Sequence, residues 1–151
     1  MQINHPLWVR ATLLYLILVH AFPGVWALLM PRAFYDHFPG FGLVWVAIDG
    51  PYNEHLIRDV GGFFIALAAL CVLTLVRPRW VAVRATAICL LMFNGPHLLY
   101  HLQHLHMLPP IERVALAATL LLTALLVLLL LWQRPMGDSA LNPSAARRNY
   151  D

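Results

Sequence analysis

The segment "VALAATLLLTALLVLLLLW", residues 114–132, contains no charged side chain, and two threonines are its only polar residues. An α-helix rises about 1.5 Å per residue, so a segment of this length spans the roughly 30 Å hydrocarbon core of a bilayer. In hydrocarbon the backbone must satisfy its own hydrogen bonds, which a helix does within one segment. The segment therefore predicts a transmembrane helix.

The rest of the chain has the same character, since 61% of its 151 residues are hydrophobic and only 11% are charged. Soluble domains carry about 25% charged residues. Four apolar segments are each long enough to cross a bilayer: 7–30, 55–76, 81–102 and 111–132. We predict an all-α protein, a four-transmembrane-helix antiparallel bundle formed by residues 1–134. An extended outer loop, residues 31–54, joins its first two helices, and residues 135–151 form a polar cytoplasmic tail.

The arginines predict the orientation, because the chain has ten basic residues and none is lysine. One side of the predicted bundle carries Arg10, Arg77, Arg79, Arg84, Arg134, Arg147 and Arg148. The other side carries Arg32, Arg58 and Arg113. The positive-inside rule then places both termini in the cytoplasm and the 31–54 loop outside. We expect a multi-pass protein of the cytoplasmic (inner) membrane in contact with the lipid bilayer, and the formal charge of +3 does not indicate a nucleic-acid surface.

The 31–54 loop is long for a compact protein, and loops of this length are usually functional or disordered. It is rich in aromatic residues: Phe34, Tyr35, Phe38, Phe41, Trp45 and Tyr52. Aromatic side chains favour the membrane interface, so we interpret the loop as a lid. Asn53 is the expected N-cap of the second helix.

Ionisable residues gather in the outer half of the predicted bundle. In "HLLYHLQHLHML", residues 97–108, the histidines His97, His101 and His104 are spaced i, i+4 and i+7 and share one helix face. Asn94 extends that face by one turn, and Pro96 frees a backbone carbonyl one turn earlier.

The first and second helices add groups at matching depths. His55 and Asp59 form a stripe on the second helix, flanked by Glu54 and Arg58, and His20 lies on the first helix. Ionisable groups cost about 2.5–3.5 kcal/mol each in a membrane interior, so they are expected to face the bundle interior and pair. We expect Asp59 to face His101. The small Gly61 and Gly62 are expected to let this helix approach a neighbour closely.

Each of these residues also has a purely structural interpretation. Arg58 with Asp59 or Glu54 is typical of a structural ion pair, and His20 alone is typical of a hydrogen-bonded packing histidine. Three stacked histidines opposite a carboxylate exceed what packing requires, so we expect a functional site.

Three classes of function fit these residues. The first is a transition-metal or haem b site, since imidazole suits Zn, Cu, Fe and Ni and ligating histidines need a supporting carboxylate. The metal ligands would come from His97, His101, His104, His55 and Asp59, supported by Glu54, Arg58 and Asn94. Haem b would be ligated by His20 and His97.

The second class is an accessory subunit of a larger membrane complex, with contacts through the fourth helix or the tail. The third is a small-molecule or lipid-modifying enzyme or carrier that transfers protons through histidine and acid groups.

Three segments carry a resemblance: "GVWALLMPRAFYDHFPG" (24–40), "GPYNEHLIRDVGGFFIAL" (50–67) and "FNGPHLLYHLQHL" (93–105). They resemble segments of small four-helix integral membrane proteins of actinobacteria, and the chain is similar to DoxX-like proteins in size and architecture. The resemblance implies a bacterial cytoplasmic-membrane protein and implies no activity, so no site residue is transferred from it.

Overall fold

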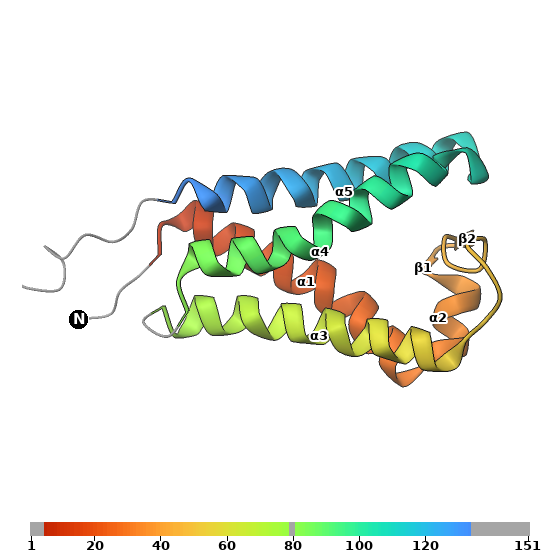
Figure 1. Ribbon diagram of the computed structural model, residues 1–151, viewed down its shortest axis with the longest axis horizontal. Helices are drawn as coiled ribbons and strands as arrows, with labels where there is room; N and C mark the ends of the chain where they lie inside the picture. The colour runs from red at the N-terminus through yellow and green to blue at the C-terminus, as the bar shows by residue number, and fades with distance from the viewer. Residues whose placement is uncertain (1–4, 79–80, 134–151) are drawn as a thin grey trace, which may run out of the picture.

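The computed structural model describes residues 5–78 and 81–133, and within them the chain is mostly helical (Figure 1). The elements in chain order are α1 (Leu7–Leu29), α2 (Pro31–His37), β1 (Pro39–Gly40), β2 (Leu43–Val44), α3 (Glu54–Val76), α4 (Val83–His104), the short 3₁₀ helix η1 (Leu105–Met107) and α5 (Pro110–Leu131). The four long helices begin and end within two residues of the predicted segments. The all-α prediction is confirmed.

Three helices, α1, α3 and α5, are long and apolar enough to cross a membrane. The helix α4 is 22 residues long but is more polar, because it contains Arg84, Asn94 and three histidines. The predicted number of four membrane-spanning helices is not confirmed, since three of the described helices qualify. The 31–54 loop contains a further short helix, α2, and an antiparallel β1–β2 ladder. The predicted cytoplasmic tail, residues 135–151, lies outside the described residues.

The helices α1 and α3 pack closely through two glycines. A Cβ atom placed on Gly61 would lie 2.7 Å from the backbone nitrogen of Leu28 and 3.0 Å from the carbonyl oxygen of Gly24. The predicted close approach at Gly61 is therefore confirmed. At Gly62 the prediction is wrong: a Cβ there would meet no atom within 4 Å, because successive helical residues point in directions about 100° apart.

The helix α4 bends near its middle, and beyond the bend it runs beside α5 and away from α3 (Figure 1). Pro96 lies inside α4, where it has no backbone N–H to donate and its ring clashes with the preceding turn. Before the bend, α3 and α4 are joined by a hydrogen bond between the hydroxyls of Thr74 and Thr86. The bend thus separates the two helices in only one half of the bundle.

Residues 31–53 fold over this separated half, and we call them the lid. The hydroxyl of Tyr35 donates a hydrogen bond of 2.6 Å to the carbonyl of Gly50, which closes the lid on itself. Asn53 caps α3 as predicted, since its side-chain oxygen accepts a 3.1 Å hydrogen bond from the amide of Leu56. Phe41 lies at the tip of the hairpin and is fully exposed.

Candidate functional site

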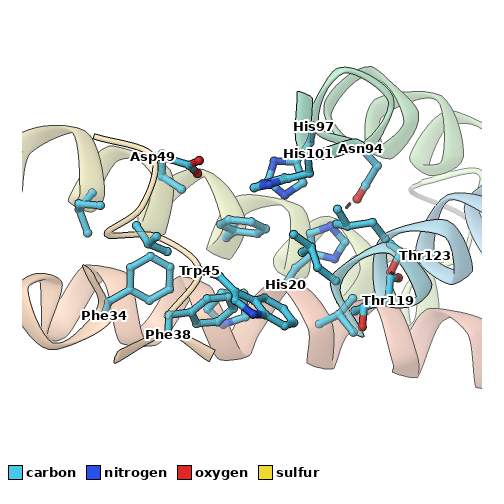
Figure 2. A pocket seen from close by; sticks show the side chains of 18 of the residues that line it. His20, Phe34, Phe38, Trp45, Asp49, Asn94, His97, His101, Thr119 and Thr123 are labelled. Carbon is cyan, nitrogen blue, oxygen red and sulfur yellow. Dashed lines mark hydrogen bonds between the residues drawn. The ribbon is translucent and has the colours of Figure 1, made fainter. Parts of the chain in front are cut away.

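A cavity of about 270 Å³ lies between α1, α3, α4, α5 and the lid. Its surface is mostly apolar, and Figure 2 shows side chains from these elements pointing into it. The polar or ionisable residues that line it are His20, Trp45, Asp49, Asn94, His97, His101, Thr119 and Thr123. Concave, mainly apolar sites with a few convergent polar groups are typical of small-molecule binding.

His20 forms the deepest polar part of the cavity, with only 1% of its surface exposed. Its Nδ1 donates a 2.7 Å hydrogen bond to the carbonyl of Leu16 one turn earlier. Since a carbonyl can only accept, Nδ1 carries the proton and Nε2 is an acceptor. The side-chain nitrogen of Asn94 lies 3.5 Å from this Nε2 and donates to the carbonyl of Leu90 at 2.8 Å.

His97 and His101 lie on successive turns of α4, after the bend. Their ring centroids are 4.5 Å apart and the rings meet edge to face. The ring of His97 also stacks on Phe93, with centroids 5.0 Å apart, and contacts the edge of Phe64. These contacts hold both imidazoles at the surface of the cavity.

The ring nitrogens of His97 and His101 have no hydrogen-bond partner among residues 5–78 and 81–133. Five of the other histidines each bond through a ring nitrogen to a backbone carbonyl or a carboxylate, at 3.2 Å or less. Polar groups in an apolar setting are costly unless they are hydrogen-bonded. Because these two imidazoles line the cavity, a molecule bound in it would supply the missing partner.

The carboxylate near this pair belongs to the lid. Asp49 lines the cavity together with His101, and Figure 2 shows the two side chains on the same side of the cavity. The expectation that Asp59 would fill this position is corrected by the structure. Asp59 instead pairs with His55 on its own helix, at 3.2 Å, and both side chains are largely exposed, at 61% and 87%.

Asp59 points away from the cavity because of the rotation of α3 about its axis, which directs the apolar residues Ile57, Val60 and Phe64 toward the cavity. Sequence reasoning therefore missed Asp49. The sequence does contain a signal for Asp49, because the lid has only two aspartates. The other one, Asp36, lies four residues after Arg32 and forms a 2.7 Å ion pair with it, which leaves Asp49 as the lid aspartate that can face the cavity.

Other predicted site residues also lie away from the cavity. His104 bonds through Nδ1 to the carbonyl of Tyr100 and stacks on that ring at 4.2 Å. Arg58 pairs with Glu54 and donates to the carbonyl of Leu28, which is the structural ion pair considered above. The cavity thus brings together His20, Asn94, His97 and His101. Within the described ranges, no group of three or more His, Cys, Asp or Glu side chains is positioned to hold a metal ion together.

The lid is tied to α5 by one hydrogen bond, in which the indole N–H of Trp45 donates to a carboxylate oxygen of Glu112 at 3.0 Å. Replacing Glu112 by alanine removes a charge-assisted acceptor, and we expect a loss of about 1 kcal/mol, or about fivefold more frequent lid opening. Hydrogen exchange of residues 38–52, followed by mass spectrometry, measures this. Glu112→Gln keeps an acceptor and is the control; equal exchange in Glu112→Ala and the wild type would show that the bond does not hold the lid.

A scan of protein-family models, a search of curated proteins and a search of solved structures each find no match to this chain.

Proposed function

We propose that this chain is a four-span protein of the bacterial cytoplasmic membrane, with α4 as its fourth span and both termini in the cytoplasm. The polarity of α4 supports rather than opposes this assignment. Asn94 is buried, and His97 and His101 line the cavity, so these three polar groups turn inward while Ile88, Met92 and Leu99 remain exposed. Polar residues of membrane helices typically face the bundle interior in this way.

The orientation is tested by labelling single cysteines with a reagent that does not cross membranes. Gly42→Cys lies in the lid and Ser144→Cys lies in the polar tail, each placed in a background in which Cys71 and Cys89 are alanine. In intact cells we expect Gly42→Cys to be labelled and Ser144→Cys to be labelled only after lysis, because the arginine excess favours the cytoplasmic side for the tail. Labelling of Ser144→Cys in intact cells would reverse the topology.

We further propose that the protein binds a small, uncharged, membrane-soluble molecule in the cavity. The observation that carries this proposal is the pair of imidazoles, His97 and His101, that line a mostly apolar cavity without a protein hydrogen-bond partner in the described residues. A ligand that hydrogen-bonds to both would remove the cost of leaving them unpaired. Since Asp49 also lines the cavity, the two imidazoles and this carboxylate can exchange a proton with the ligand.

The test is to purify the full chain in detergent, extract it with organic solvent and identify bound molecules by mass spectrometry. We expect a stoichiometric neutral compound in the wild type and much less of it in a His97→Leu, His101→Leu double variant. Recovery of equal amounts from both proteins would mean that the compound is carried by the detergent micelle, and would count against the proposal.

A transition metal or haem b is the second candidate, and the state of His20 favours it. Metal-ligating histidines usually donate their other ring N–H to a carbonyl or carboxylate, and the Nδ1 of His20 does so to Leu16. Its Nε2, together with His97, would then be the ligand pair. Elemental analysis and an absorption spectrum of the same purified sample test this. A Soret band or one equivalent of metal would support it, and the absence of both would exclude it.

A further inference from the structure

Building on the proposed function, we infer that the molecule bound in the cavity is a quinone or quinol, with its ring between the His97–His101 pair and the aromatic side chains of the lid. Three properties of the cavity point to this class: its charge, its hydrogen-bonding groups and its shape.

The charge of the cavity disfavours anionic ligands, because no arginine lines it among the described residues. The arginines at this end of the bundle have other partners. Arg32 pairs with Asp36, Arg58 pairs with Glu54, and Arg113 donates to the carbonyls of Leu108 and His106.

The one acidic residue lining the cavity in the described ranges is Asp49. A fatty-acid carboxylate or a lipid phosphate would thus meet a like charge and no compensating cation, which is unfavourable in a site of low dielectric. An anionic ligand is therefore disfavoured.

The hydrogen-bonding groups fit a carbonyl or hydroxyl oxygen of the head group. Each neutral imidazole offers one N–H donor and one acceptor nitrogen, so His97 and His101 can both donate to one carbonyl oxygen of a quinone, and a hydroxyl of a quinol can donate to one of them and accept from the other. Their rings lie in adjacent positions, 4.5 Å apart between centroids. A simple alcohol offers such an oxygen but no planar ring, so it is the shape of the cavity that favours a quinone over an alcohol.

The shape of the cavity fits a planar ring. Phe64 lines it beside His97, and Phe38 and Trp45, whose ring centroids are 6.2 Å apart, face it from the lid (Figure 2). Aromatic side chains bind rings by offset or edge-on contacts. The volume of about 270 Å³ lies just below the roughly 300–1,000 Å³ of drug-sized sites, so it accommodates a head group and not a long tail.

The tail would leave the cavity toward lipid. Leu56 lines the cavity and is nevertheless 58% exposed, so the cavity reaches the outer surface of α3 at this residue. An isoprenoid chain leaving there would enter the bilayer that the proposed topology places around the helices.

The test measures binding of three probes to the full chain in detergent, by the shift each causes in the midpoint of thermal unfolding. Decylubiquinone represents the quinone, decanoate an anionic lipid and dodecanol a neutral alcohol. We expect a saturable stabilisation by decylubiquinone alone, an affinity at least about fivefold weaker in His97→Leu or His101→Leu, and no change in His106→Leu. His106 is the matched control because it bonds to the carbonyl of Gln103 and does not line the cavity. Unfolding without probe establishes that each variant is folded.

The possible results distinguish failure of the quinone assignment from failure of the proposed small-molecule site. If dodecanol or decanoate binds as well as decylubiquinone and with the same dependence on the two histidines, the quinone assignment is wrong while a small-molecule site stands. If none of the probes binds and solvent extraction of the wild type also yields no compound, the proposed function itself fails. If decylubiquinone binds equally to the wild type and to both histidine variants, the inference is overturned because the quinone then lies elsewhere.

Discussion

Replacing His97 and His101 together by leucine is expected to reduce the affinity for the cavity's ligand by about 30-fold while the helices still insert and pack. A hydrogen bond contributes about 1 kcal/mol net, so two lost bonds cost about 2 kcal/mol. Leucine leaves α4 more apolar, which favours membrane insertion. The measurement is the amount of extracted compound per mole of protein, with native mass spectrometry of the same samples.

Two further variants make this result specific. The His97→Gln, His101→Gln variant keeps polar groups at the cavity and should retain part of the binding, which a role in packing alone would not predict. The His104→Leu, His106→Leu variant lies on the same stretch of chain, where both imidazoles bond to backbone carbonyls, and it should bind normally. Equal loss of ligand in this second variant would point to general disruption of α4 rather than to the cavity.

The second large effect is expected at the contact between α1 and α3. Gly61→Ala should lower the free energy of unfolding by about 3 kcal/mol, at the upper end of the range for overpacked cores. The added Cβ would lie 2.7 Å from the backbone nitrogen of Leu28, and a backbone atom cannot move aside as a flexible side chain can. The two helices must therefore separate, which also disturbs the cavity that lies between them. Thermal unfolding in detergent measures the loss.

Gly62→Ala is the matched control, because a Cβ there meets nothing within 4 Å. Alanine stabilises a helix interior by about 0.8–1 kcal/mol relative to glycine, so this variant should be as stable as the wild type or slightly more stable. Equal destabilisation by the two substitutions would mean that glycine is needed for the conformation of α3 and not for its contact with α1.

Several features of the fold could be predicted because they depend on local sequence. Each helix is defined by an apolar run between charged or helix-breaking residues, and Pro31, Pro109 and Asn53 lie at such ends. The structure consequently places the helices within two residues of the expected bounds. Glu112, which accepts the hydrogen bond from Trp45 of the lid, is far from Trp45 in sequence, and a contact of that kind carries no local signal.

The fold of the lid and the direction of the bend in α4 could not be predicted from local sequence. Residues 31–53 have no sustained hydrophobic periodicity, so their short helix and hairpin depend on where the aromatic side chains find contacts. Pro96 removes one backbone hydrogen bond within α4, yet the direction in which α4 then bends depends on its packing against α5.

For the candidate site, the sequence by itself determined that His97 and His101 share a face of one helix with Asn94, because helical periodicity relates residues four and seven apart. Only the tertiary structure decided what that face meets: His20 from α1 and Asp49 from the lid, and not Asp59. Periodicity fixes the relative directions of side chains within one helix, but the rotation of that helix about its axis is set by its neighbours. Close packing of α1 against Gly61 sets the rotation of α3, and this turns Asp59 outward, where it pairs with His55.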